Sequence, residues 1–228
     1  MTTFDENLYL DTELARHLYN QYAKNLPIID YHCHVQAKEI FENKEFEDIG
    51  QMWLAGDHYK WRAMRTFGIE ETYITGSASF EEKFYKFAEI VPYLIGNPLY
   101  IWCALELKRY FGIEEMLCAE NAERIFAQTK ALIKSNHITP QWCMEKSNVE
   151  LVCTTEDPID DLCFHKKLAG KTKTRILTAF RPDQAMFCER SAFASYVKKL
   201  EEASGVSIAS FEDLVNALAN RLLFFTSM

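Results

Sequence analysis

Two histidines separated by one residue end the first apolar stretch of the chain, and their side chains are well suited to binding a metal ion. They are His32 and His34, in the run Pro27-Ile28-Ile29-Asp30-Tyr31-His32-Cys33-His34-Val35. Side chains alternate between the two faces of a strand, so a strand here directs both imidazoles to one face, together with Ile28 and Asp30. Neutral imidazole is the commonest metal-binding side chain, and parallel α/β proteins place their chemistry at the carboxyl ends of strands. The residues alone leave two interpretations open: a metal-binding pair, or two histidines hydrogen-bonded in an ordinary core.

The other face of this strand is apolar and is expected to pack under helices. It carries Ile29, Tyr31, Cys33 and Val35. Because alternation turns Cys33 away from both imidazoles, the pattern argues against a nucleophilic cysteine activated by histidine. The seven cysteines are odd in number and include no C-x-x-C pair. We therefore expect reduced, mostly buried thiols rather than a zinc knuckle or a disulfide framework.

Length and charge exclude several classes of protein. The chain has 228 residues, of which 48% are hydrophobic and 25% charged, as in a globular protein of one or two domains. Its net charge of -8 argues against nucleic-acid binding, which needs a basic surface to displace counterions. No secretory signal opens the chain, and no apolar run approaches the ~20 residues of a membrane span. We expect a cytoplasmic protein.

Periodicity predicts the elements that must position the histidines. A helix is expected over 11–25, capped by Asp11 or Thr12, and a strand begins at Pro27. From residue 36 to 148 the pattern is helical almost throughout, and its dense aromatic residues are expected to form the core between helices.

The period of two returns in the last third of the chain. Strands are expected over 149–155 and 175–180. After the first of them, Asp157 is expected to cap a helix that has Pro158 at its first position and ends near Gly170. Two helices close the chain, the second beginning at Ser210.

Strands that alternate with helices predict a parallel sheet with right-handed crossovers. A closed eight-stranded barrel takes about 250 residues without a long insertion. We therefore expect an α/β fold that holds only the opening part of such a barrel, in a chain truncated relative to a complete enzyme. The predicted organisation is 1–35 for the first helix and strand, 36–148 for the helical insertion, and 149–228 for the next strands with their helices.

Several segments in this order resemble uronate isomerase (glucuronate isomerase), a family of the amidohydrolase superfamily. They are spread over most of the chain: Asp5-Glu6-Asn7, Pro27 to His34, Gly56-Asp57-His58-Tyr59-Lys60-Trp61-Arg62-Ala63-Met64-Arg65, Gly96-Asn97-Pro98-Leu99-Tyr100, Thr154-Thr155-Glu156-Asp157-Pro158-Ile159-Asp160 and Arg181-Pro182-Asp183. The resemblance implies a distorted (β/α)8 TIM barrel with a helical insertion after strand 1. It also implies an intramolecular oxidoreductase that converts D-glucuronate to D-fructuronate and D-galacturonate to D-tagaturonate in hexuronate catabolism.

For the site, the resemblance implies that His32 and His34 bind a divalent metal, with zinc the expected ion. The family's third ligand is an aspartate from the last barrel strand, and nothing in this chain corresponds to that strand. Two imidazoles leave zinc short of the three protein ligands typical of catalytic sites, so we expect weak metal binding by this chain. The expected partner is a small hexuronate, with no nucleic acid and no membrane; homo-oligomerisation is left open.

Four further residues are candidates for the site of an aldose–ketose isomerase. Asp57 is expected to cap a helix that carries His58 and Tyr59. By resemblance, Tyr59 contacts the reacting hydroxyls and shuttles a proton, and His58 is a neighbouring substrate contact; the alternative is a solvent-exposed helix face without a role in catalysis. Arg181, which ends the third strand, can grip the substrate carboxylate bidentately, or can instead form a salt bridge to Asp183 or Asp157. Asp30 is expected to orient an imidazole or to end in the polar floor of the barrel.

Three alternatives to an active isomerase stay open. The superfamily also contains metal-dependent hydrolases, and a fragment of such a fold can serve assembly alone. An open three-stranded sheet also exposes an unpaired edge and an apolar helix stripe. On that ground this polypeptide by itself is expected to be inactive and prone to aggregate.

Overall fold

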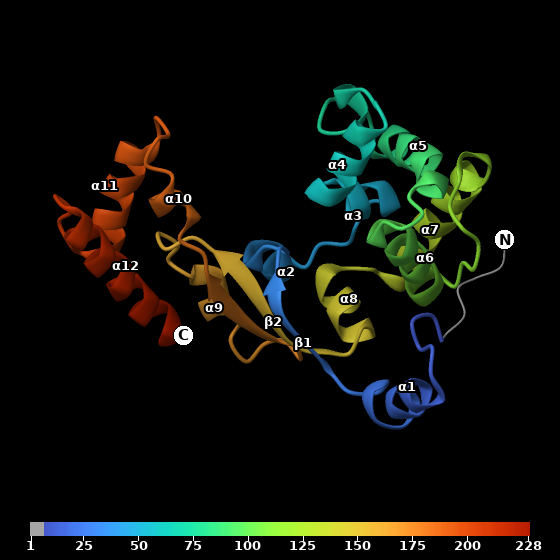
Figure 1. Ribbon diagram of the computed structural model, residues 1–228, viewed down its shortest axis with the longest axis horizontal. Coiled ribbons are helices and arrows are strands. Elements are labelled where there is room, and N and C mark those ends of the chain that lie inside the picture. Colours follow the sequence, from blue (N-terminus) through green and yellow to red (C-terminus); the bar gives the residue numbers. More distant parts are fainter. Residues whose placement is uncertain (1–6) are drawn as a thin grey trace. The chain divides into compact units, whose positions relative to one another are not determined.

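A computed structural model describes residues 7–228, so Asp5 and Glu6 of the first resemblance segment lie outside the described residues. The chain divides into two compact units, and each is described by itself. The helical unit holds residues 7–26 and Lys44–Cys143, and the sheet unit holds Pro27–Asn43 and Met144–Met228 (Figure 1). The strand with the histidines thus belongs with the last third of the chain. The three predicted segments 1–35, 36–148 and 149–228 remain a prediction about the complete fold.

The helical unit is built from helices throughout its long segment, as the periodicity predicts. Its elements are α1 (Glu13–Leu18), a π-helical turn (Tyr19–Ala23), α3 (Ile49–Leu54), α4 (His58–Thr66), α5 (Phe80–Ile90), α6 (Pro98–Phe111), α7 (Ala122–Asn136) and the start of α8 (Pro140–Lys146), with short 3-10 turns at Glu71–Tyr73, Val91–Tyr93 and Ala119–Asn121. Thr12, one of the two predicted caps, accepts a hydrogen bond from the backbone N–H of Ala15. No single described helix is long and apolar enough to cross a membrane; only the bent pair Phe80–Tyr93 and Pro98–Phe111 meets that test jointly.

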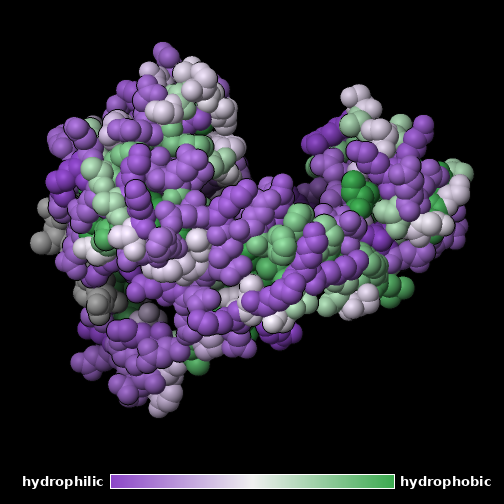
Figure 2. All heavy atoms as spheres, turned by 180° about the vertical axis from the view of Figure 1, so that it is seen from behind, coloured by the Kyte–Doolittle hydropathy of each residue, from purple (hydrophilic) through white to green (hydrophobic). Residues whose placement is uncertain are grey.

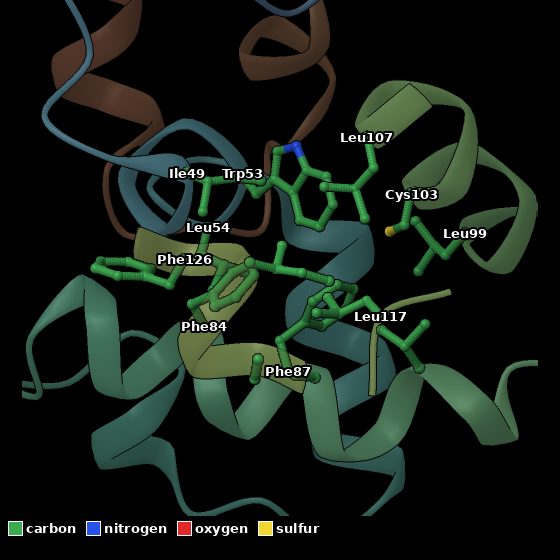
Figure 3. Packing of buried hydrophobic residues seen from close by; sticks show 14 of the residues in the cluster. Ile49, Trp53, Leu54, Phe84, Phe87, Leu99, Cys103, Leu107, Leu117 and Phe126 are labelled. Atoms are coloured by element: carbon green, nitrogen blue, oxygen red, sulfur yellow. The ribbon is translucent and has the colours of Figure 1, made fainter. Parts of the chain in front are cut away.

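Aromatic side chains fill the core of the helical unit, which confirms their predicted role. Trp53 of α3 lies against Phe84 and Phe87 of α5, with ring centroids 6.0 and 6.2 Å apart (Figure 3). The two helices approach closely because Gly50 has no side chain: a Cβ there would lie 2.2 Å from the carbonyl oxygen of Phe80. Trp102 is an exception among the four tryptophans, because it is half exposed.

The sheet unit carries three parallel strands in the order β1-β2-β3, flanked by helices (Figure 1). The strands are β1 (Ile28–Cys33), β2 (Val149–Glu156) and β3 (Arg175–Phe180), and the helices are α2 (Ala37–Glu42), α9 (Cys163–Leu168), α10 (Asp183–Met186), α11 (Phe193–Ser204) and α12 (Phe211–Thr226). The three predicted strands and the parallel arrangement are confirmed. Because the strands are parallel, their carboxyl ends meet at one edge of the sheet.

Two apolar clusters hold this unit together. Ile40 of α2 and Leu168 of α9 bury Val152 of β2. Helices α11 and α12 pack on each other through residues that include Leu200 and Ala217. The predicted start of the last helix at Ser210 is confirmed, because the Ser210 hydroxyl accepts a hydrogen bond from the N–H of Asp213 at the start of α12.

The predicted packing of the apolar face of β1 is wrong for two of its residues. Ile29 is 63% exposed and Tyr31 80% exposed, whereas Cys33 packs against the cluster around Val152. The reason is the place of β1 at the edge of the described sheet, together with two irregularities in its register to β2, between Ile28 and Ile29 and between Asp30 and Cys33. The strand also ends at Cys33, so His34 follows it instead of belonging to it.

The predicted helix start at Asp157 is also wrong. Helix α9 begins at Cys163, and residues 157–162 form a loop. Three aspartates in this loop bind backbone N–H groups two residues on: Asp157 to Ile159, Asp160 to Leu162 and Asp161 to Cys163. These local side-chain contacts compete with helix formation, and they favour turns at Asp-rich segments.

On the face shown in Figure 2, hydrophilic residues predominate and hydrophobic residues gather in places. In the sheet unit, the exposed apolar side chains include Ile29 and Tyr31 of β1 and Phe211, Leu222 and Leu223 of α12. Leu222 of α12 is thus exposed, whereas Phe225 of the same helix is buried and contacts Phe180 of β3, with ring centroids 5.2 Å apart.

Candidate metal-binding site at the carboxyl edge of the sheet

The structure brings the two predicted metal-binding histidines together. The Nε2 atoms of His32 and His34 are 3.1 Å apart, and the ring centroids are 5.0 Å apart at an angle of 73°. Both side chains are exposed at the end of β1. The predicted alternative of two histidines satisfied in an ordinary core is therefore not what the structure shows.

The spacing of the two nitrogens suits a shared metal ion. Two imidazole nitrogens on one tetrahedral zinc lie about 3.3 Å apart, since each Zn–N bond is about 2.0 Å long. The observed 3.1 Å between the Nε2 atoms is close to that value. Within residues 7–228, no group of three or more His, Cys, Asp or Glu side chains is placed to hold a metal ion. His32 and His34 therefore fit two of the ligand positions of a zinc site, and residues 7–228 provide no third ligand beside them.

The residues beside the pair have local roles. Asp30 accepts a hydrogen bond from the backbone N–H of His32 at 3.3 Å, so the structure shows it on the backbone and not on an imidazole. The sulfur of Cys33 accepts from the N–H of Val35, also at 3.3 Å. Burial raises the pKa of the Cys33 thiol, and the negative charge of Asp30 raises it further, which disfavours the nucleophilic thiolate. All seven cysteines are free, but the expectation that most are buried is wrong: only Cys103 is fully buried, and Cys188 is exposed.

Arg181 lies at the same edge of the sheet, directly after β3. Its backbone N–H binds the carbonyl of Glu156 at the end of β2. Its Nε lies 2.7 Å from a carboxylate oxygen of Asp183, which is one of the two salt bridges that the sequence left open; the structure shows none to Asp157. Both side chains of this pair are well exposed, so the pair contributes at most about 1 kcal/mol. The guanidinium can therefore exchange Asp183 for another carboxylate at little cost.

Tyr59 and His58 open helix α4 in the helical unit. Asp57 caps this helix as predicted, and its carboxylate accepts from the N–H groups of Tyr59 and Lys60. The rings of His58 and Tyr59 lie at 33° to each other with centroids 4.2 Å apart, and the Arg62 guanidinium lies 5.9 Å from the Tyr59 ring. These residues belong to the other compact unit, so their approach to the histidine pair remains a prediction.

A buried ionic cluster supports the start of α4. Lys60 is 6% exposed, and its Nζ lies 2.6 Å from Asp57 Oδ2. Burial opposes the charge of Lys60, but the carboxylates of Glu106 and Asp57 outweigh this and raise its pKa. Burial also disfavours the charged form of Glu106, and so raises the pKa of its carboxyl group. Sequence reasoning did not single out this cluster, because its lysine looks like an ordinary solvated residue of a helix.

A second polar group that sequence reasoning missed lies on β2. The hydroxyl of Thr154 is 2.8 Å from Glu156 Oε1 and 2.7 Å from Nε2 of the buried His165. A hydroxyl has one proton to donate, so when it donates to the Glu156 carboxylate, His165 must donate its Nε2–H to the hydroxyl. Burial lowers the pKa of His165 and raises that of Glu156. The only signal in the sequence was a lone histidine on an apolar helix.

This network predicts a pH dependence of stability in the sheet unit. Below pH ~6.5 the unfolded chain takes up a proton on His165 that the folded chain resists, so the free energy of unfolding should fall as the pH falls. The slope for one proton is at most about 1.4 kcal/mol per pH unit. His165→Gln keeps an N–H donor and does not titrate, so it should flatten the curve. Urea unfolding between pH 5 and 8, followed by the methyl NMR signals of Val152 and Leu168, measures this; parallel curves for the two proteins would contradict it.

The fold is an α/β architecture, with helices around a three-stranded parallel sheet. Two imidazoles and an arginine lie at the carboxyl edge of the sheet, which is where such folds place their active sites. The sequence profile of the family described as glucuronate isomerase matches residues 1–228. The chain belongs to the glucuronate isomerase family.

Known relatives agree with this assignment. The chain is 49% identical over 222 residues to a uronate isomerase of Shouchella clausii, covering 96% of this chain and 47% of the relative. It is 48% identical over 224 residues to that of Bacillus subtilis, covering 97% and 47%. The crystal structure of uronate isomerase from Thermotoga maritima matches with a TM-score of 0.90 at 37% identity, over 100% of this chain and 50% of that one. The chain thus spans about half the length of the curated relatives it matches.

Proposed function

We propose that this chain forms the part of a uronate isomerase that carries two metal ligands, His32 and His34, and that the whole protein interconverts aldose and ketose hexuronates. The expected reactions are D-glucuronate to D-fructuronate and D-galacturonate to D-tagaturonate. The observation that carries the proposal is the 3.1 Å approach of the two Nε2 atoms at the carboxyl edge of a parallel sheet, in a chain of this family. The expected place of action is the cytoplasm.

The fold and the metal complete the proposal. The three parallel strands are the opening part of a (β/α)8 barrel of the amidohydrolase superfamily, with the helices between β1 and β2 as its insertion. His32 and His34 would hold a divalent ion, expected to be zinc, and an aspartate that this chain does not contribute would be the third protein ligand. When bound, the ion supplies an electrophile near the substrate oxygens.

The chain's own residues account for the rest of the reaction. Isomerisation removes a proton from the carbon beside the aldehyde and returns one to the aldehyde carbon, through an enediol. Tyr59 is the candidate for that proton transfer, and the guanidinium of Arg62 lies 5.9 Å from its ring. His58, beside Tyr59, would contact the substrate. Arg181 would leave Asp183 and bind the substrate carboxylate with both arms of its guanidinium.

A chimera tests this function directly. Residues 1–228 replace the matching first half of the Bacillus subtilis uronate isomerase, to which they are 48% identical. The chimera should isomerise glucuronate or galacturonate, and His32→Ala should lower both its metal content and its turnover at least 10-fold, because two protein ligands then remain of three. Arg181→Lys should raise the Michaelis constant for the uronate.

Two controls make the result decisive. The 228-residue polypeptide alone, assayed in parallel, should show no turnover and a tendency to aggregate. A chimera that folds to a single species and binds zinc but isomerises neither uronate would contradict the proposed reaction. Unchanged zinc stoichiometry in His32→Ala would remove this histidine from the ligand set.

A further inference from the structure

A side-chain hydrogen bond adds to the backbone ladder between the segment that carries the two histidines and the neighbouring strand. The hydroxyl of Thr155, on β2, donates to the backbone carbonyl of Cys33 at 2.9 Å. We propose that Thr155 is the positioning residue of the histidine pair: by holding the Cys33 carbonyl, it keeps the His32 and His34 rings in contact. The inference rests on the proposed function in one respect, namely that the pair binds a metal ion.

The backbone ladder is irregular just before Cys33, so a side-chain contact can determine what the ladder leaves undetermined. Asp30 pairs with Val152 and Cys33 with Thr154, so β1 advances three residues where β2 advances two. One residue of β1 is therefore extra, as in a β-bulge, and a bulge locally disrupts the ladder and turns the side chains that follow it. The directions of the two imidazoles are thus not determined by regular alternation.

The bound carbonyl is well placed to set those directions. It belongs to the peptide unit that joins Cys33 to His34, and it lies between the two histidines in the chain. Fixing its oxygen fixes the plane of that peptide, and with it the starting direction of the His34 side chain. The contacts of Asp30 and Cys33 with backbone N–H groups, both 3.3 Å long, stay within the segment itself. The Thr155 contact instead reaches across to β2, beside the ladder pair of Cys33 with Thr154.

The side chain of Thr155 is suited to this work. Threonine is branched at Cβ, which restricts its χ1 rotamers, so its hydroxyl is held in place with little loss of freedom. The preceding Thr154 points to the opposite face of the strand, where its hydroxyl binds Glu156 and His165. The two adjacent threonines therefore serve separate structures, and Thr155 can be altered without touching the His165 network.

The chain offers a matched control for this contact. The hydroxyl of Thr174 donates to the carbonyl of Val149 at 2.7 Å, at the amino end of the same sheet. Thr174→Val therefore removes the same type of hydrogen bond, far along the strands from the histidines. Thr155→Val removes the hydroxyl at the site while it keeps the size and branching of the side chain, and Thr155→Ser keeps the hydroxyl.

The experiment uses the chimera of residues 1–228 with the second half of the Bacillus subtilis enzyme, prepared without metal and with 13C-labelled histidine rings. In the parent chain and in Thr155→Ser and Thr174→Val, a nuclear Overhauser contact between the rings of His32 and His34 is expected, because their centroids are 5.0 Å apart. Thr155→Val should lose this contact. A titration with Co²⁺, followed by paramagnetic broadening of the same ring signals, should show a dissociation constant raised 10- to 100-fold in Thr155→Val. Serine should restore it to within about 2-fold of the parent value.

The outcomes separate this inference from the proposed function. If Thr155→Val keeps both the ring contact and the Co²⁺ affinity, or if Thr174→Val loses them equally, Thr155 does not position the pair. A different outcome would contradict the metal site of the proposed function. In that outcome the parent chain shows the ring contact, but Co²⁺ does not broaden the ring signals, or broadens them equally in His32→Ala. In that case the ring contact alone still decides the role of Thr155.

Discussion

Replacing Arg221 by methionine should lower the free energy of unfolding of the sheet unit by about 3 kcal/mol and free the loop that follows β2. Arg221, on α12, is only 8% exposed. Its guanidinium donates to three backbone carbonyls: Pro158 at 2.6 Å and Asp160 at 2.7 Å in the loop, and Ala203 at 2.9 Å in α11. Methionine keeps much of the apolar stem but leaves these carbonyls without their donor, and each unsatisfied buried group costs about 1–3 kcal/mol.

The planar fork of arginine is what allows three contacts at once, so Arg221→Lys should recover only part of the loss. Urea unfolding followed by the methyl signals of Val152 and Leu168 measures stability, and amide exchange over 157–162 measures the release of the loop. Arg190→Met is the matched control, because Arg190 is an exposed arginine over the ring of Phe187. Equal effects of the Arg221 and Arg190 variants would show that the carbonyl contacts are not what holds the loop.

A second large effect is expected in the helical unit, where Lys60→Met should cost about 3 kcal/mol. The change removes the ammonium but keeps the stem that lies against Trp53, with the Nζ 5.5 Å from the ring. Breaking a buried ion pair by removing one partner typically costs about 3–5 kcal/mol. The lower end applies, because the side chain of Asp57 is 27% exposed and keeps its backbone N–H partners.

All four tryptophans lie in the helical unit, so tryptophan fluorescence during urea unfolding reports on this unit alone. Lys86→Met provides the comparison: Lys86 pairs with Glu89 at 2.8 Å on an exposed face of α5, and such pairs contribute under about 1 kcal/mol. We expect Lys60→Met to be clearly the less stable variant. Similar midpoints for the two would mean that the Asp57, Lys60 and Glu106 cluster does not stabilise the start of α4.

Local sequence signals were sufficient for the elements of this protein. Alternation and β-branched residues marked the three strands, and the 3.6-residue period marked the helices between them. The caps at Thr12, Asp57 and Ser210 followed from side chains that can accept a backbone N–H. The failures also had local causes: at 157–162, successive aspartates made turns where a proline after Asp157 had indicated a helix.

The sequence by itself therefore determined the helices, the parallel strands, and the presence of two imidazoles at a strand end, because these depend on neighbouring residues. Only the tertiary structure decided which distant groups meet. Thr155 reaches the Cys33 carbonyl, and Arg221 reaches the loop after β2, across 122 and 63 positions of the chain. Neither contact has a periodic pattern, since each depends on the register of a bulged strand or on how one helix packs. The 3.1 Å approach of His32 and His34 is likewise a product of that register.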